Sequence, residues 1–270
     1  MLFSVIIPVY NTGNDLRRAL DSVLLQKGNF SDYEVVAIDD GSNDKETLHI
    51  LSFYDNRYGN LRVIHQENSG GVAARRRGIA EATGRYITFF DSDDEVTPDY
   101  MQTLHDMVQE EADLYVFNNY LVRNGQPFLE KHDCPQGGDN HSEYVLRKLF
   151  QIKMDAVWDK IYLREAFLPV KEKLPKAIMF GDDMYMNMKY IVSRRIHRAL
   201  IMEKPIYYHY IGTESSVSMR KSDMNRIFDT KVCIMALEEA AQCYPALNLV
   251  EEGKDFCYGY MLRHLCNIIR

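Results

Sequence analysis

Two groups of carboxylates in this chain stand where they could do chemistry. The sequence Asp-Ser-Asp at 91–93 follows the apolar run 86–90, and the pair Asp182 and Asp183 opens a stretch of helical periodicity. Hard divalent cations prefer oxygen ligands, and Mg²⁺ or Mn²⁺ commonly takes one or two carboxylates while substrate phosphates complete its shell. A half-buried carboxylate beside a second one has a raised pKa and can serve as a general base. Each group also fits an ordinary structural role, as a turn or as a helix N-cap.

Residues suited to nucleotide binding lie at other strand ends. Asp39 and Asp40 follow the apolar run 34–38, where a carboxylate can accept hydrogen bonds from a base or a ribose. Ser42 fits the N-cap of the helix that follows. Three consecutive arginines occupy 75–77, and the planar guanidinium group suits phosphate. Because neighbouring residues on a helix point in different directions, we expect at most two of them to serve one ligand.

The elements that position these residues alternate between strand and helix in the first half of the chain. The predicted strands are 3–9, 34–38, 61–64, 86–90 and 114–122, and the predicted helices are 15–26, one capped by Ser42, 70–82 and one that begins at Thr97-Pro98. This alternation predicts an α/β fold with a mostly parallel sheet. Ligands bind at the carboxyl ends of such strands. We therefore expect Tyr10, Asp40, Asn68 and 91–94 to face one crevice.

The second half is less regular. We expect a loop or small excursion over 123–138, a helix over 142–150 and a mixed segment over 157–205 that is helical after Gly181. The end of the chain predicts two helices around Pro245.

Bulk properties narrow the function classes. The net charge of −7 argues against a nucleic-acid binder that neutralises phosphates. No apolar run approaches the ~18 residues that span a bilayer, and the start has no basic region typical of a signal peptide. The five cysteines lack metal-binding spacing, so we expect neither structural zinc nor disulfides and favour a cytoplasmic location. The Gly70-Gly71 pair matches neither the dinucleotide fingerprint nor the P-loop.

Taken together, seven short motifs resemble the bacterial family-2 glycosyltransferases of GT-A fold. They occur in the family's order and spacing. They are Ser-Val-Ile-Ile-Pro-Val-Tyr-Asn at 4–11, Ile-Asp-Asp-Gly-Ser at 38–42, Asn-Ser-Gly-Gly at 68–71, Ala-Arg at 74–75 with Gly-Ile at 78–79, Phe-Asp-Ser-Asp-Asp at 90–94, Trp-Asp-Lys at 158–160 and Gly-Asp-Asp at 181–183. The resemblance is dense over the first 100 residues and patchy to about Ser218.

The resemblance implies a role for each matched residue. The nucleotide-binding set would be Pro8, Val9 and Tyr10 around the nucleobase, Asp40 at the base edge, Asn68 and Arg75 holding the nucleotide, and Asp91 with Ser92 by the ribose. Asp93 would ligate Mn²⁺ or Mg²⁺ under the diphosphate. Asp183, beside Asp182, would be the general base of an inverting reaction, and Trp158 and Lys160 would lie near the sugar or the acceptor.

The chain departs from the family pattern at several positions. Arg76 stands where the family usually has Asn, and Asp182 where it has Glu. Ile211 and Thr213 replace arginines in the segment from Tyr208 to Ser218, which weakens the expectation of a phosphate-bearing acceptor there. His209 in the same segment is a candidate further metal ligand.

These observations predict an inverting, metal-dependent glycosyltransferase. It would move a sugar from a nucleotide-diphosphate donor, most commonly a UDP-sugar in this family, to a hydroxyl of a glycan or lipid-linked acceptor in cell-surface polysaccharide synthesis. We expect a GT-A domain over 1–218, with a nucleotide-binding half over 1–122 and an acceptor half over 123–218, and a helical extension over 219–270. Peripheral contact with the inner face of the cell membrane and a homodimer both stay open. The alternatives are a sugar-phosphate nucleotidyltransferase, which would normally show a Gly-rich N-terminal phosphate loop, and a non-catalytic sugar-nucleotide binding module.

Overall fold

A computed structural model describes most of the chain. It covers residues 1–28, 30–132, 141–151, 153–167, 181–212, 223–247, 249, 254, 255 and 258.

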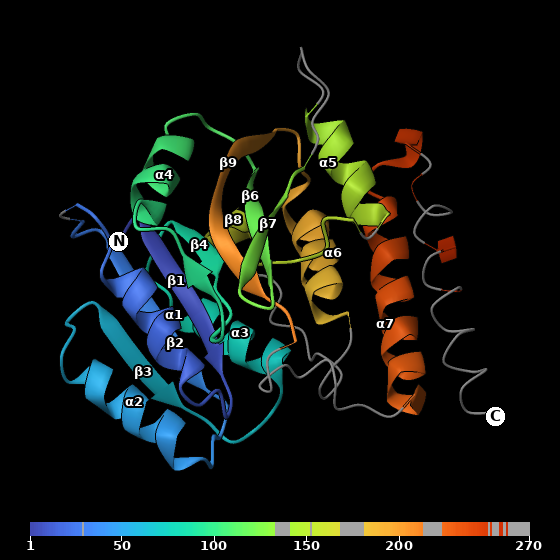
Figure 1. Ribbon diagram of the computed structural model, residues 1–270. Coiled ribbons are helices and arrows are strands. Elements are labelled where there is room, and N and C mark those ends of the chain that lie inside the picture. Colours follow the sequence, from blue (N-terminus) through green and yellow to red (C-terminus); the bar gives the residue numbers. More distant parts are fainter. Residues whose placement is uncertain are drawn as a thin grey trace.

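The first half forms the parallel part of a sheet (Figure 1). Its strands are β1 (Phe3–Val9), β2 (Tyr33–Asp39), β3 (Leu61–His65) and β4 (Tyr86–Phe89), in the spatial order β3-β2-β1-β4. Helices α1 (Asp15–Leu24), α2 (Lys45–Asp55) and α3 (Gly71–Glu81) connect them. Strands β1, β2 and β4 are buried along nearly their whole length because both faces of the sheet are covered there, whereas β3 is only partly buried.

The second half continues the same sheet. Beyond β4 the order is β8 (Lys160–Leu163), β6 (Leu114–Arg123), β9 (Ala199–Tyr210) and the two-residue strand β5 (Glu95–Val96). Strand β8 runs antiparallel between β4 and β6, whereas β9 runs parallel to β6. Strand β7 (Gln126–Glu130) pairs with the end of β6 as a hairpin. The predicted α/β architecture is confirmed.

Helices cover both faces of the sheet and define two cores (Figure 1). Buried residues of α1, α2 and α4 (Tyr100–Met107) fill one core. Residues of α3, α5 (His141–Phe150), α6 (Asp182–Arg194) and α7 (Asp223–Ala241) fill the other. Short 3₁₀ turns lie at Arg164–Ala166 and Pro245–Leu247. Helix α7 thus shares a core with the predicted acceptor half, and the predicted boundary at 218 lies outside the described residues.

The predicted loop or small excursion over 123–138 begins as the β6–β7 hairpin, because Asn124 and Gly125 both adopt positive φ and close a tight two-residue turn. Two local predictions are wrong. Asp44, not Ser42, caps α2, since its carboxylate accepts the Thr47 N–H at 2.8 Å. Helix α4 begins at Tyr100.

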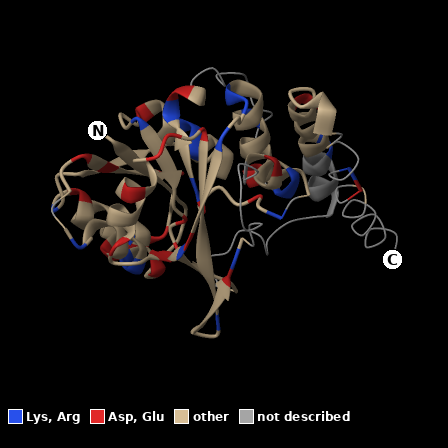
Figure 2. Ribbon diagram, turned by 90° about the horizontal axis from the view of Figure 1, so that it is seen from above, with Lys and Arg blue, Asp and Glu red and all other residues tan. Residues whose placement is uncertain are grey.

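Acidic and basic residues are interspersed over the described helices and strands (Figure 2). Among the described residues, no helix is long and apolar enough to cross a membrane.

Candidate active site

The loops after β1 and β2 are joined by hydrogen bonds. The side-chain oxygen of Asn11 accepts the backbone N–H groups of Asn43 and Asp44, at 2.8 and 3.2 Å, and its own N–H donates to Ser42 Oγ. Asn11 has a φ of 50°, a left-handed conformation that Asn tolerates better than most residues. This junction fixes the end of β1, where Val9 is buried, Pro8 is half-buried and Tyr10 is exposed.

Asp40 organises the loop between β3 and α3. Its Oδ1 accepts hydrogen bonds from Gln66 Nε2 and the Ser69 N–H, and its Oδ2 accepts the Gly70 N–H at 2.8 Å. Gly41 next to it has a φ of 74°, and a Cβ there would lie 2.8 Å from the backbone nitrogen of Asn68. Asp40 is buried and bonded within the chain, while Asn68 is exposed.

Arg75 joins three carboxylates from distant parts of the sequence. Its Nη1 donates to Asp182 Oδ2 at 2.7 Å, its Nη2 donates to Asp91 Oδ1 at 3.0 Å, and Nη2 lies 3.5 Å from Asp183 Oδ1. Only 8% of its side chain is exposed. Although burial disfavours the charged form, the three carboxylates raise the pKa of Arg75 above its usual range. Asp91 and the pair at the start of α6 therefore meet at one cation, which α3 supplies.

Asp183 has the electrostatics of a base. Burial raises its pKa well above the usual range, Asp182, Asp91 and Asp155 add to this rise, and Arg75 opposes it. Its Oδ2 accepts only a long hydrogen bond from the Val157 N–H at 3.3 Å. Its Oδ1 is buried with no hydrogen-bond partner in the described part of the chain, an arrangement that is costly and needs an explanation. The side chains of Asp182 and Asp183 remain 27% and 22% exposed.

The start of α6 is held by α7. Gly181 has a φ of 72°, and a Cβ there would lie 2.8 Å from Cys233 Sγ. The Cys233 thiol donates to the Gly181 carbonyl at 3.3 Å. A side chain at 181 would be strained and would clash with α7, so glycine is what allows the Asp182–Asp183 pair to reach Arg75.

A second cluster centres on Asp94, which was expected at the crevice but for which no role was predicted. Its carboxylate is fully buried and accepts hydrogen bonds from the Tyr207 hydroxyl at 2.8 Å, from His209 Nδ1 at 3.0 Å and from the Tyr210 N–H at 2.8 Å. Burial raises the pKa of Asp94 to about 6, and His209 opposes the rise. Burial lowers the pKa of His209, but Asp94, Asp91 and Asp93 outweigh it and raise that pKa to about 9. Strand β9 thus places His209 beside the loop that follows β4.

Trp158 lies against this cluster. Its ring stacks on Tyr207 and on His209, with centroids 4.6 and 4.9 Å apart. Lys160, predicted to bind substrate, is fully buried, and its Nζ donates to the Ala156 carbonyl and to Asp159 Oδ1, both at 2.5 Å.

A buried ion pair holds the Trp158 segment. Asp159 Oδ2 accepts from His132 Nε2 at 3.0 Å on the side opposite its contact with Lys160. Although burial opposes it, Lys160 and His132 lower the pKa of Asp159. Lys160 therefore lies where it can position Trp158, and its ammonium group does not face solvent.

The remaining predicted residues lie on the loop after β4. Ser92 Oγ is 2.7 Å from Thr12 Oγ1, and the Asp93 carbonyl accepts a hydrogen bond from Arg18. The Arg18 guanidinium also lies over the Tyr210 ring, 4.0 Å from its centroid. The loop is thus fixed to α1 and to β9.

A divalent cation fits the residues around this loop. An ionised Asp94 can only accept a hydrogen bond, so His209 Nδ1 donates to it. Because the pKa of His209 is raised to about 9, Nε2 also carries a proton near neutral pH, and a cation has to displace that proton to bind there. A metal-binding histidine commonly has such a carboxylate behind it. Within the described residues, no three His, Cys, Asp or Glu side chains form a ready-made metal site. The residues present therefore fit a cation that is held by Asp93 and His209 and that has donor phosphates in its remaining coordination positions.

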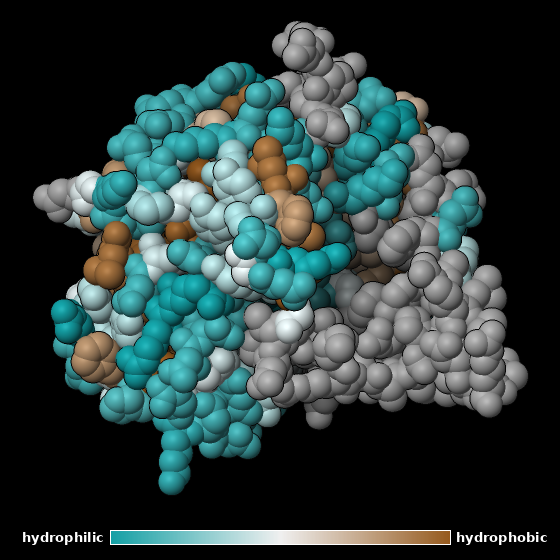
Figure 3. Space-filling model, in the orientation of Figure 1, coloured by the Kyte–Doolittle hydropathy of each residue, from teal (hydrophilic) through white to brown (hydrophobic). Residues whose placement is uncertain are grey.

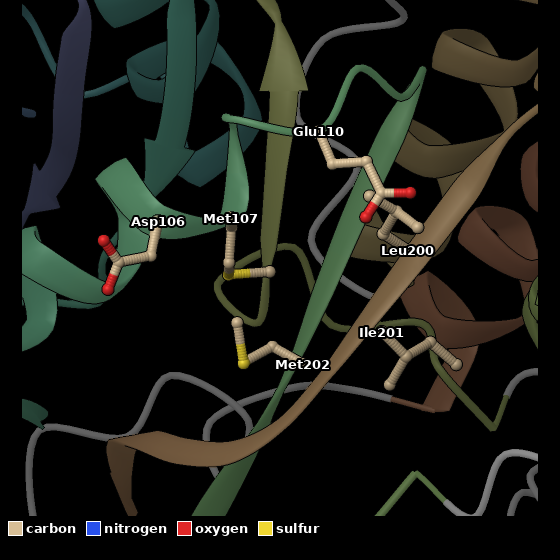
Figure 4. Close-up of a pocket in the computed structure, with 6 residues that line it drawn as sticks. All are labelled: Asp106, Met107, Glu110, Leu200, Ile201 and Met202. Carbon is tan, nitrogen blue, oxygen red and sulfur yellow. The ribbon is translucent and has the colours of Figure 1, made fainter.

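A shallow pocket between α4 and β9 lies apart from these clusters (Figure 4). Its volume is about 150 Å³, and its lining is Asp106, Met107, Glu110, Leu200, Ile201 and Met202. None of the predicted site residues lines it, and we assign it no role.

Comparison with known proteins decides the family. The model of the family described as Glycosyl transferase family 2 matches residues 4–169. GlyG, a glycosyltransferase of Streptococcus pneumoniae, is 42% identical over 97% of this chain and 95% of its own length.

The chain belongs to glycosyltransferase family 2.

Solved structures resemble this glycosyltransferase in fold. Staphylococcus aureus TarS 1–349 in complex with UDP-GlcNAc has a TM-score of 0.70 and 23% identity, covering 87% of this chain and 66% of that one. The mannosyltransferase PcManGT of Pyrobaculum calidifontis, in complex with GDP-Man and Mn²⁺, has a TM-score of 0.63 and 14% identity, covering 98% and 74%. The chain spans about a third of the length of two further curated relatives, at 32% and 30%. The family does not support the alternative of a sugar-phosphate nucleotidyltransferase.

The structure brings six of the fourteen predicted site residues of this glycosyltransferase into two adjoining clusters. One contains Arg75, Asp91, Asp182 and Asp183, and the other contains His209 and Trp158 around Asp94. Pro8, Val9, Tyr10, Asp40 and Asn68 lie at the ends of β1 and β2 and on the loop before α3.

The sequence motifs did not indicate Tyr207 or Asp155, and they placed Asp94 at the crevice without a role of its own. Burial raises the pKa of Asp155 to about 6. Its position three residues before Trp158 was the available signal.

Proposed function

We propose that the chain is an inverting, metal-dependent glycosyltransferase that uses a UDP-sugar and an acceptor hydroxyl on a glycan or lipid-linked glycan. The observation that carries this proposal is Asp183. Its buried Oδ1 accepts no hydrogen bond within the described residues and lies 3.5 Å from Arg75 Nη2, and its raised pKa suits a general base. The UDP-GlcNAc bound to the similarly folded TarS supports the choice of donor. We further propose a role in cell-surface polysaccharide synthesis, on the resemblance noted in the sequence.

The proposed reaction is a single displacement. The acceptor oxygen forms a bond to the anomeric carbon from the face opposite the diphosphate, and its proton passes to Asp183. The bond from the anomeric carbon to the diphosphate oxygen breaks, and its electron pair leaves with the nucleotide diphosphate. Bound at Asp93 and His209, Mn²⁺ or Mg²⁺ would supply Lewis-acid stabilisation of the diphosphate.

The other residues hold these groups in place. We assign Arg75 to orient Asp91 and the Asp182–Asp183 pair, because both of its terminal nitrogens already donate to carboxylates. This replaces the expectation that Arg75 holds the nucleotide. Lys160 is likewise a positioning residue, which keeps Trp158 stacked on His209.

The nucleotide would lie at the ends of β1 and β2. Tyr10 and Pro8 offer the accessible side chains for a base, and Asp40 fixes the loop that carries Asn68. Asp91 and Ser92 are assigned to the ribose side of the site.

A donor screen tests the proposal. UDP-, dTDP- and GDP-sugars are incubated with Mn²⁺, and release of the nucleotide diphosphate is measured for the native protein and for Asp183→Asn. We expect turnover of a UDP-sugar that disappears with chelator. A protein that binds donors but releases no nucleotide with any donor or acceptor would instead be a binding module.

A further inference from the structure

The β6–β7 hairpin extends the face of the sheet that carries His209. The strand register pairs His209 with Leu121 on β6 and pairs Leu121 with Phe128 on β7. Residues paired across neighbouring strands project from the same face. Trp158 stacks on both Tyr207 and His209, so this face is the one that borders the candidate active site. We call His209, Leu121 and Phe128 the acceptor row.

Phe128 ends the acceptor row in an exposed position. Its side chain is 58% exposed, although burial is the usual state of a phenylalanine. Neighbouring strands lie ~4.8 Å apart, so Phe128 is roughly 10 Å from His209 along the sheet. Figure 3 shows apolar side chains at the surface over the strands that Figure 1 labels β6 and β7.

Polar pairs flank the apolar part of the row on the same face. On one side Asn119 Nδ2 donates to Glu130 Oε2 at 2.9 Å, and on the other side Arg123 is paired with Gln126 near the hairpin turn. An aromatic ring bordered by hydrogen-bonding groups suits a ligand that has apolar C–H faces and a rim of hydroxyls. A pyranose ring has this chemistry.

We propose that the acceptor row is a sugar-binding subsite for the acceptor, in which the Phe128 ring stacks on a sugar unit next to the one that is glycosylated. The site continues directly from His209, so one saccharide chain could reach both. This inference rests on the proposed function, because it assigns the acceptor of that same reaction. It commits to a saccharide as the occupant.

The hairpin supplies its own control. Leu129 follows Phe128 and is 45% exposed, but it is paired with Tyr120 and Tyr208 in the next row along. Successive residues of a strand point to opposite faces, so Leu129 lies on the far side of the sheet from the acceptor row. Neither side chain belongs to the machinery described above.

The experiment compares Phe128→Ala, Phe128→Trp and Leu129→Ala with the native protein. Free cellobiose, lactose and N,N′-diacetylchitobiose serve as acceptors because they carry no aromatic group. We expect Phe128→Ala to raise the acceptor KM by about 10-fold, equivalent to ~1.4 kcal/mol, with the donor KM and the acceptor-free release of UDP unchanged. Phe128→Trp should keep the native KM, and Leu129→Ala should change it less than about twofold.

Each other outcome counts against the proposal. Equal acceptor KM values for Phe128→Ala and the native protein, or equal losses in Phe128→Ala and Leu129→Ala, would overturn it. Acceptance of none of the disaccharides by a protein that turns over its donor would overturn the saccharide assignment. A change in oligomeric state confined to Phe128→Ala would make this face a protein interface. Failure of donor turnover in the native protein would instead refute the proposed function, so the two failures are distinguishable.

Discussion

The polar residues at the ends of β1 and β2 differ sharply from those around α6. In the first region the carboxylates accept backbone N–H groups: Asp39 accepts the Ser42 N–H, Asp40 accepts two backbone N–H groups, and Asp44 caps α2 through one of its two oxygens. Around α6, Asp182 and Asp183 instead share one guanidinium with Asp91.

The difference separates two uses of the same residue type. Carboxylates that accept backbone N–H groups fix a loop and lose little by being ionised. Carboxylates crowded around one cation in a buried site keep a proton affinity that chemistry can use. We therefore expect mutations in the first region to act on stability and binding, and mutations in the second to act on rate.

The largest effect should come from the loop after β4. Asp93→Ala should lower the transfer rate by about 1000-fold, since metal stabilisation of the leaving group is worth several kcal/mol. Mn²⁺ titration of the protein with UDP should lose its nucleotide-dependent component, while the circular dichroism spectrum stays native. Full activity of the variant in chelated buffer would remove Asp93 from the metal site.

Removal of the Arg75 guanidinium, the cation at the centre of the second region, should lower the free energy of unfolding. Arg75→Met leaves Asp91, Asp182 and Asp183 without their counter-ion, and loss of one partner of a buried ion pair costs ~3–5 kcal/mol. Arg77→Met is the matched control, because its guanidinium is 52% exposed and pairs with Glu81 on the surface. Urea unfolding should show a change below about 1 kcal/mol for the control. Equal losses in the two variants would show that the Arg75 cluster is not a coupled unit.

Loss of the proposed base should lower the transfer rate without weakening the binding of the donor. Asp183→Asn keeps the size of the side chain and should lower the transfer rate by ~100-fold or more with little change in donor affinity. Pre-steady-state transfer and calorimetric UDP-sugar binding check the two parts. Parallel loss of binding would make Asp183 a donor-site residue, and loss of transfer in Asp182→Asn alone would reverse the roles within the pair.

The pH profile sharpens the same assignment. The pKa of Asp183 is raised well above its usual range, chiefly by burial. A base must be deprotonated, so the rate should fall as pH falls through this raised pKa, by about tenfold per pH unit on the limb. The limb should lie at a pH above that of an ordinary aspartate and should be absent from the residual rate of Asp183→Asn. A rate that stays flat down to pH 4 would exclude this base.

The smallest effect should come from the first region. Asp40→Ala removes the acceptor for three hydrogen bonds and should cost about 2 kcal/mol in thermal or urea unfolding. Affinity for free UDP should fall because the loop carrying Asn68 loses its anchor, while the rate at saturating donor should change little. Unchanged UDP affinity would remove Asp40 from the nucleotide site.

The sequence predicted the first half of the fold well for a physical reason. Strands β1 and β2 are buried on both faces, so their apolar runs are continuous and their ends are marked by polar residues. Strand β7 is exposed along its whole length, and β9 carries Lys204 and Pro205 in its middle. Neither has the periodicity or the continuous apolar run by which a strand is predicted.

The residues of the candidate site could be predicted from the sequence, but the contacts between them could not. Asp183 and Asp93 could be named from local patterns, but the burial of Lys160 against Asp159 cannot be inferred from a motif. The contact between Asp94 and His209 joins residues 115 positions apart. Only the pairing of β9 with β5 and β6 brings them together.

That long separation sets a time order during synthesis. Asp94 leaves the ribosome early and its partners on β9 come 115 residues later, so at ~5–20 residues per second the growing chain waits roughly 6–23 s for them. During that interval the loops after β1 and β2 can form while Asp94 lacks Tyr207 and His209. The proposed nucleotide site can thus fold before the Asp94 cluster, whose hydrogen bonds are complete only after residue 210 has emerged.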